Sequence, residues 1–524
     1  MIRILVDACY TALTVDTEEE LVFVYKTLSV EIPDTNPNAY FGASTPRKTM
    51  YSFIRDSKFP TGLLSFLLGQ LQENLLPFEL NWAPGCATLP YVVNVRQHTF
   101  PHPLRENQLL LIEEAIVDGR GVLCAATSAG KTAMMAGILK GLGTPPGLII
   151  VGSRSLVQQT RDEVGLWLGE PVGEISSQRL ILQPPVVVGL VNSLSAASGE
   201  PWFKEFMATR KVVFCDEAHH VARSATFRKG GKVITKIAQG MWFELLMRCP
   251  APNRYGVSAT PLKVDDPVQN WRLVGATGSM FKNRVTSTAL IDAGYAARPY
   301  IYFMPFKTKK LSKETLNRVC REASLVTGKC AGAAARYQAA VQLGIVECKE
   351  RNDAVVDAAS TLYAQGLKVL VFVEQVIHGS TLEAALRARG LPAAFISGKH
   401  TQQEQEALLA WLREPGARIM VSTRVLGEGV NVPALGALVF ACGGKAFVKI
   451  FQAVGRVLRI AAGKDRCIVV LPDDTHNAYL KAHCEKLKLY LSAEPGYRVA
   501  VPGQSLAAFA KAVMGDVADA VGVE

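Results

Sequence analysis

Residues 122–132 read Val-Leu-Cys-Ala-Ala-Thr-Ser-Ala-Gly-Lys-Thr, an apolar run that leads into a loop of small residues. The apolar run predicts a buried β-strand, and the residues that follow, 133–142, predict a helix. In this strand–loop–helix order, backbone N–H groups at the start of the helix can hold phosphate oxygens. Lys131 can then reach the β- and γ-phosphates, and the hydroxyl of Thr132 can bind Mg²⁺. The stretch therefore predicts a nucleotide-binding α/β domain.

The loop departs from the strict phosphate-binding pattern at one position, because Ala125 stands where Gly is usual. A Gly-Lys-Thr sequence alone can occur by chance, so the position of the loop directly after a buried strand carries the interpretation. The residues that we expect to bind the nucleotide in this loop are Thr127, Ser128, Ala129, Gly130, Lys131 and Thr132.

Two adjacent acids form the second chemical element. Asp216 and Glu217 end the apolar run 212–215 and lie 85 residues after Lys131. Side chains at the carboxyl end of a strand in an open α/β sheet face the ligand crevice. Asp216 can hold the water shell of a metal ion, and Glu217 can orient and deprotonate an attacking water. The alternative is an acidic strand end in a surface turn, which the phosphate loop upstream disfavours.

Unalternating apolar runs recur along the chain and are separated by helical stretches, which is typical of a parallel sheet covered on both faces. We therefore expect an α/β protein with two parallel-sheet lobes, a small α+β N-terminal domain and a helical C-terminal tail. The predicted parts are 1–98, 99–300, 301–475 and 476–524, with a Pro-rich connector after the first. The predicted strands are 122–126, 148–151, 186–189, 212–215 and 255–258 in the first lobe, and 369–373, 393–397, 419–422, 437–441 and 467–471 in the second.

Composition limits the class of protein. The chain has 524 residues and a formal net charge of +11, while residues 1–100 hold seven Lys or Arg and ten Asp or Glu. The basic remainder suits a polyanionic partner such as nucleic acid. No apolar run is long enough to span a membrane, so we expect no membrane partner. The 11 cysteines include no Cys-x-x-Cys pair, which indicates reduced thiols in a cytoplasm.

The second lobe contributes a pair of arginines. Arg456 and Arg459 are three residues apart, so they lie on one side of a helix. Arginines supplied from a second lobe can stabilise the charge that develops on a γ-phosphate. A solvated basic helix face is the commoner role for such a pair. Gly455 and the apolar residues around it favour a packed helix instead.

The order of these motifs over residues 104–460 resembles that of the superfamily 2 helicases and translocases. The resemblance rests on segments 104–108, 125–132, 152–158, 216–219, 258–260, 421–431 and 452–459. It implies two RecA-like lobes with ATP and Mg²⁺ bound between them, and a nucleic-acid strand that crosses both lobes.

The resemblance also assigns roles to single residues. It places Arg105 and Gln108 at the adenine base, and it makes His219, Ser258 and Thr260 the link between the ATP site and nucleic acid. From the second lobe it adds Gly427, Glu428 and Asn431 at the nucleotide, and Gln452 beside the two arginines. Asn431 stands where Asp is usual, so a contact to ribose there would be uncharged. The implied nucleic-acid contacts are Arg154, Ser193, Ser397, Gly398 and Thr423.

Three details resemble the UvsW-like and XPB-like branch, which acts in fork remodelling and repair. The loop Thr127-Ser-Ala-Gly-Lys-Thr132 and the segment 290–299 between the lobes are similar to those of the branch. The third is the front segment 47–64, which resembles a small duplex-contacting domain. Its basic residues Arg47, Lys48, Arg55 and Lys58 are phosphate-contact candidates, and a plain solvated face is the alternative. The Trp-Asp-Gly turn of that domain is not found in this sequence.

The resemblance implies an ATP-dependent DNA helicase or translocase that remodels branched DNA in replication, recombination or repair. We expect a monomer in a bacterial or phage-infected cytoplasm, with replication or recombination proteins as candidate partners. An RNA helicase shares every ATPase motif and stays an alternative. So does the motor subunit of a restriction or defence complex, although the sequence shows no nuclease motif.

Overall fold

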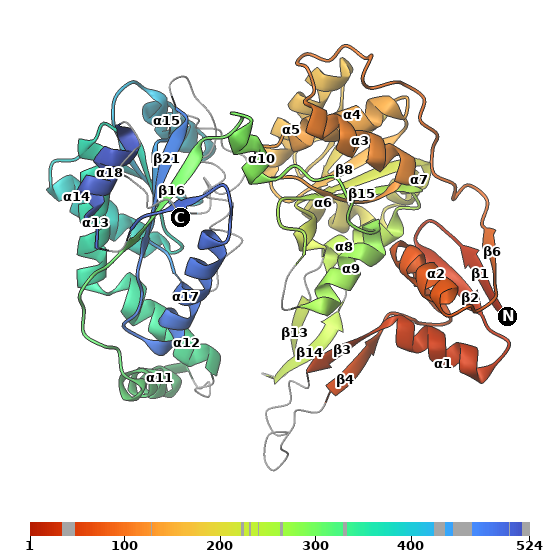
Figure 1. Ribbon diagram of the computed structural model, residues 1–524, viewed down its shortest axis with the longest axis horizontal. Coiled ribbons are helices and arrows are strands. Elements are labelled where there is room, and N and C mark those ends of the chain that lie inside the picture. The colour runs from red at the N-terminus through yellow and green to blue at the C-terminus, as the bar shows by residue number, and fades with distance from the viewer. Residues whose placement is uncertain are drawn as a thin grey trace. The chain divides into compact units, whose positions relative to one another are not determined.

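The protein is described here by a computed structural model (Figure 1). The residues that it describes are 1–33, 48–126, 128–221, 225–229, 232–238, 240–262, 266–327, 333–423, 435–443, 464–501 and 503–515. They form two compact units, Met1–Thr286 and Ser287–Glu524, and each unit is treated by itself.

A mostly parallel sheet organises the first unit. Among the described residues its strand order is β10-β9-β11-β8-β12-β15-β7, and β10 alone runs antiparallel to its neighbour. The central strands are fully buried, as the unalternating apolar runs predict. The strands are β7 (Arg120–Cys124), β8 (Gly147–Val151), β9 (Gly173–Ile175), β10 (Leu180–Ile181), β11 (Val186–Leu190), β12 (Val212–Asp216) and β15 (Asn253–Ser258).

Helices connect and cover these strands (Figure 1). They are α3 (Glu106–Asp118), α4 (Lys131–Gly141), α5 (Arg154–Leu168), α6 (Val191–Ala196), α7 (Pro201–Thr209), α8 (Met241–Arg248) and α9 (Pro267–Thr277). A hairpin of β13 (Ala225–Lys229) and β14 (Lys232–Ala238) follows the two acids. Every strand expected in this lobe is present within two residues of its predicted bounds.

The N-terminal residues form a second sheet in the same unit, with strand order β5-β2-β1-β6. Its elements are β1 (Ile2–Val6), β2 (Tyr10–Thr14), α1 (Glu18–Thr27), β5 (Lys58–Pro60), α2 (Leu64–Glu73) and β6 (Phe78–Trp82). β3 (Ser29–Pro33) and β4 (Lys48–Ser52) form a separate hairpin. The Pro-rich connector from residue 83 to residue 105 contains no helix or strand, as expected.

This front part shares its hydrophobic core with the ATP lobe through α9. Val268, Trp271 and Val274 of α9 pack among the buried side chains of the front sheet. The approach is closest at Gly62, where a Cβ atom would lie 1.9 Å from the carbonyl oxygen of Val274. The front sheet is thus a separate sheet but not a separate core.

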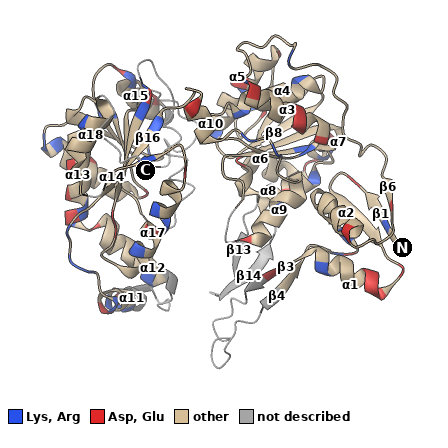
Figure 2. Ribbon diagram, in the orientation of Figure 1, with Lys and Arg blue, Asp and Glu red and all other residues tan. Residues whose placement is uncertain are grey.

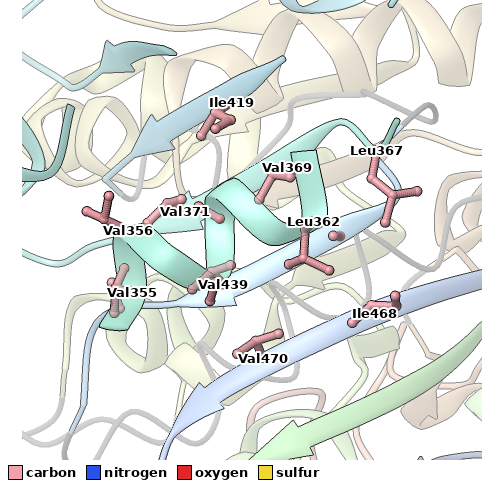
Figure 3. Packing of buried hydrophobic residues seen from close by; sticks show 14 of the residues in the cluster. Val355, Val356, Leu362, Leu367, Val369, Val371, Ile419, Val439, Ile468 and Val470 are labelled. Atoms are coloured by element: carbon pink, nitrogen blue, oxygen red, sulfur yellow. The ribbon is translucent and has the colours of Figure 1, made fainter. Parts of the chain in front are cut away.

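The second unit is built on an all-parallel sheet with strand order β18-β19-β17-β20-β21-β16-β22 in its described residues. The strands are β16 (Arg298–Met304), β17 (Val369–Phe372), β18 (Ala393–Ile396), β19 (Ile419–Ser422), β20 (Ala437–Phe440), β21 (Arg466–Pro472) and β22 (Arg498–Val499). Figure 3 shows Val355, Val356 and Leu362 of one helix packed over the sheet. The strands predicted for this lobe are confirmed, each within two residues.

The helices of this unit are α10 (Ser287–Asp292), α11 (Lys313–Thr327), α12 (Ala333–Val341), α13 (Lys349–Ala364), α14 (Val376–Ala388), α15 (Gln402–Arg413), α17 (Ala478–Ser492) and α18 (Leu506–Met514). The C-terminal tail is helical, as expected, and it also completes the lobe. β22 pairs with β16, and Phe509, Ala510 and Val513 of α18 are buried in the core of the sheet.

Candidate active site

The phosphate loop is held by backbone hydrogen bonds to the end of β15 and to Val285, which lies outside the named strands. Ala125 N donates to Ser258 O at 3.0 Å, and Ala126 N donates to Val285 O at 2.8 Å. The turn itself needs left-handed backbone, with φ of 70° at Ser128 and 77° at Gly130. A non-glycine residue such as Ser128 adopts this region only when its surroundings enforce it, which is common at ligand sites. α4 then begins at Lys131, so the N–H groups of its first turn face the loop.

Arg105 and Gln108 brace this loop from the start of α3. Gln108 Nε2 donates to the carbonyl oxygen of Ala129 at 2.7 Å, and the guanidinium of Arg105 donates to the same oxygen. Gln108 Oε1 in turn accepts from the backbone N–H of Arg105 at 2.8 Å, and only 4% of Gln108 is exposed. The adenine contact expected of these two residues stays a prediction, whereas the brace was not foreseen from the sequence.

The two acids lie where the central strand ends. β12 ends at Asp216, and Glu217 follows in left-handed backbone with φ of 51°. Asp216 Oδ1 accepts from the backbone N–H of Glu217 at 2.9 Å. The carboxylate of Glu217 extends to the phosphate loop, because Lys131 Nζ donates to Glu217 Oε1 at 3.1 Å. The loop and the acids are therefore parts of one site.

Burial and charge act differently on the two carboxyl groups. Burial raises the pKa of Asp216, and the charge of Glu217 adds to this effect. Burial also opposes ionisation of Glu217, but the adjacent Lys131 ammonium and the His219 ring outweigh it. They hold the pKa of Glu217 well below its ordinary value. Glu217 is therefore a carboxylate at neutral pH, which is the form that can accept a proton.

His219 connects the acids to the end of β15. Its Nδ1 atom lies 3.3 Å from Glu217 Oε2 and 3.3 Å from Ser258 Oγ. Ser258 Oγ accepts from the backbone N–H of Thr260 at 3.2 Å. A continuous chain of polar contacts thus runs from Lys131 to Thr260. The neighbouring His220 stacks on Trp242 with ring centroids 5.3 Å apart.

The residues expected to contact nucleic acid follow the carboxyl ends of neighbouring strands. In the first unit, Arg154 follows β8 and Ser193 follows β11, and these strands are paired. In the second unit, Ser397 follows β18 and Thr423 follows β19, which are also paired. Arg154 and Gly398 are exposed, Ser193 is partly exposed, and Ser397 and Thr423 are 1% and 8% exposed. Within each unit these residues thus lie at the same edge of the sheet, and their contact with nucleic acid stays a prediction.

Several expected site residues lie outside the described part of the chain. They are Arg47, Thr127, Gly427, Glu428, Asn431, Gln452, Arg456 and Arg459. Lys48 begins β4, but its side chain is not described.

The donor set fits Mg²⁺ better than a transition metal. Thr132 and Asp216 offer hydroxyl and carboxylate oxygens, and Mg²⁺ at nucleotide sites binds one or two protein oxygens together with phosphates. Within the described ranges, no cluster of three or more His, Cys, Asp or Glu side chains could hold a metal ion. None of the described helices has the length and apolar character of a membrane span.

Comparisons with known proteins agree with this geometry. The family model of the res subunit of type III restriction enzymes matches residues 102–263, and the helicase conserved C-terminal domain matches residues 351–461. The chain belongs to helicase superfamily 2. The two matches fall on the two lobes, so the resemblance found in the sequence is confirmed.

Relatives of this superfamily 2 chain include two viral proteins. A putative helicase of Sulfolobus islandicus filamentous virus is 22% identical over 72% of the chain and 64% of the relative. The ATP-dependent DNA helicase uvsW of Enterobacteria phage T4 is 25% identical over 66% of the chain and 63% of the relative. The chain thus spans less than two thirds of either relative.

Among solved structures, a fragment of a putative HsdR subunit of a type I restriction enzyme from Vibrio vulnificus has a TM-score of 0.53 at 16% identity. This match covers 87% of the chain and 76% of the fragment. It shows a shared fold.

Proposed function

We propose that this protein is an ATP-dependent DNA translocase or helicase that remodels branched DNA. The observation that carries the proposal is the contact chain from Lys131 through Glu217 and His219 to Ser258 and Thr260. It joins a phosphate-binding lysine, a base and the end of the neighbouring strand β15. Such a chain can report the state of the nucleotide to a surface that contacts nucleic acid.

In the proposed mechanism, backbone N–H groups of residues 128–132 and the Lys131 ammonium hold the phosphates of ATP. Mg²⁺, bound by Thr132 and Asp216, would neutralise phosphate charge. Glu217 orients the attacking water and accepts its proton. Arg456 and Arg459 stabilise the charge of the transferring phosphoryl group, as arginine fingers do in related enzymes. Change at the γ-phosphate then reaches Thr260 through His219 and Ser258.

DNA is favoured as the substrate because the uvsW relative is named a DNA helicase. The protein would bind the strand through its backbone phosphates, so activity should depend little on base sequence. A second candidate is the motor subunit of a restriction complex, which the match to the res subunit model favours. RNA unwinding remains a third candidate, since its ATPase site would be the same.

One experiment separates these candidates. ATPase rates are measured in parallel with single-stranded DNA, duplex, fork, four-way junction and structured RNA. The proposal expects the largest stimulation with the fork or junction. If structured RNA stimulated the ATPase more than every form of DNA, the protein would be an RNA helicase and the proposal would be wrong. Equal stimulation by duplex and branched DNA would favour a duplex-tracking restriction motor.

A further inference from the structure

An extended strap of chain in the second unit carries a row of lysines that no ATPase motif explains. Residues 305–312 connect β16 to α11, and Lys313 is the first residue of that helix. Together, residues 305–313 read Pro-Phe-Lys-Thr-Lys-Lys-Leu-Ser-Lys. The strap holds four lysines and no acid. Its lysines, Lys307, Lys309, Lys310 and Lys313, are all exposed. Figure 2 shows the charged residues of this segment, which leads into α11.

The uncharged residues of the strap hold it against the unit. The ring of Phe306 packs edge-on against His476, with ring centroids 5.5 Å apart. Thr308 Oγ1 donates to Glu350 Oε2 at 3.3 Å. Leu311 N donates to His476 O at 2.9 Å, and Leu311 O accepts from Asn477 Nδ2 at 3.2 Å. The strap is therefore fixed at three points, and the lysines lie between and beside them.

Two other surface lysines of the unit are paired with acids. Lys349 Nζ pairs with Asp353 at 2.6 Å, and Lys481 Nζ lies 3.6 Å from Glu485. Within the described part of the chain, Lys307, Lys309 and Lys310 have no acidic side chain at ion-pair distance. The charge of Lys313 acts on the neighbouring Glu314. Like charges in a row on a fixed backbone repel one another, and a bound polyanion relieves this repulsion. The binding of a polyanion to the strap is therefore favourable.

We propose that the lysine strap, residues 305–313, is a second nucleic-acid contact that binds backbone phosphates outside the helicase motifs. Lysine is a compact point charge that binds phosphate without reading bases, which suits a protein that moves along a strand. Because the backbone of the strap is already fixed, binding orders little more than the lysine side chains. The inference rests on the proposed function, since it takes nucleic acid as the partner.

Salt titration of fork binding tests the strap. The strap variant replaces Lys307, Lys309, Lys310 and Lys313 with Gln. The matched control replaces four exposed lysines elsewhere, Lys204, Lys349, Lys481 and Lys511, so that both variants lose the same charge. Each lost phosphate contact reduces the magnitude of the log–log salt slope by roughly 0.7–0.9, so the four substitutions of the strap variant should reduce it by up to about 3.6. The control should keep the slope of the unchanged protein, and ATPase without nucleic acid should be equal in all three.

Two results would overturn the strap as a contact. Equal slopes for all three proteins would make the strap a solvated surface, and equal losses in both variants would reflect overall charge alone. Both results require that the unchanged protein binds the fork. If the unchanged protein neither binds nucleic acid nor shows stimulated ATPase, the proposed function itself fails, which separates the two failures.

Discussion

Lys131 Nζ donates to Glu217 Oε1 at 3.1 Å, so the cation of the phosphate loop and the carboxylate after β12 are paired directly. Glu217 also contacts His219, whose ring lies 3.3 Å from its other oxygen. Phosphates that enter the loop compete with Glu217 for Lys131. When Lys131 turns to the phosphates, Glu217 keeps the histidine contact, which connects the arrival of nucleotide to Ser258.

Replacing Lys131 with Ala should reduce ATP turnover by about 10²-fold or more, because charge on the phosphates loses a preorganised donor. The fold should persist, since the partly buried Lys131 is not a residue of the hydrophobic core and its removal opens no core cavity. ATPase rate and a melting curve check this. Lys140→Ala, at the other end of α4, is the control and should retain activity. Near-normal turnover in Lys131→Ala would mean that the site lies elsewhere.

Glu217→Gln should separate nucleotide binding from chemistry. Gln keeps the shape and hydrogen bonding of Glu but cannot accept the proton, and losing a general base typically costs ~10²–10⁴-fold in rate. ATP should still bind, because Lys131 is released from its carboxylate partner. Filter binding of labelled ATP beside the turnover rate measures both effects. Loss of binding together with rate would show that Glu217 shapes the site instead of acting as the base.

His378 should make the second unit less stable in mild acid. It is 1% exposed, and its Nε2 lies 2.9 Å from Asn352 Oδ1. Burial, aided by the charge of Arg351, lowers the pKa of His378 to about 4. The unfolded chain, with a pKa near 6.5, binds this proton first, so stability falls as the pH drops from 6.5 towards 4. Between pH 7.5 and pH 5 the loss from this group is about 2 kcal/mol.

The measurement is the free energy of unfolding at both pH values for the unchanged protein and His378→Gln. The variant should be less stable at pH 7.5 but should lose about 2 kcal/mol less on acidification. Identical pH dependence in the two proteins would assign the acid sensitivity to other groups.

Gly62→Ala should loosen the junction between the front sheet and α9. The new methyl group would meet the carbonyl oxygens of Val274 and Gly275 at 1.9 Å and 2.7 Å, and backbone cannot yield as a side chain can. Overpacking of this kind costs roughly 1–3 kcal/mol. Gly69→Ala is the matched control, because nothing lies within 4 Å of a Cβ there and Ala favours the interior of α2. Equal melting temperatures in both variants would show that the junction adjusts freely.

The sheets could be predicted from the sequence because each buried strand is a short, continuous apolar run bounded by loop residues. Val186–Gly189 and Ile419–Ser422 need no knowledge of their neighbours to be recognised as strands. α1 was not predicted, although Thr17 and Glu20 form a capping box at its start. Its apolar residues mix with charged ones, so its helical period is weak.

The sequence predicted which residues belong to the site, but it did not predict how these residues contact one another. The patterns around Lys131 and Glu217 indicate their chemistry, but the distance between them depends on the order of β12, β15 and β7 in the sheet. The brace from Gln108 to Ala129 likewise depends on how α3 approaches the loop. Val268, Trp271 and Val274 have ordinary helical spacing, and spacing alone cannot say which core a helix face enters.

The packing of α9 against Gly62 limits how the chain can be cut or recombined. A protein that began at residue 99 would leave Val268, Trp271 and Val274 facing water, and an apolar patch of this kind promotes aggregation. A gene fusion that exchanged residues 1–98 alone would need a donor shaped to the same helix. The smallest segment that can be transferred to another protein is therefore the whole of Met1–Thr286, which contains both the ATP-binding loop and the front sheet.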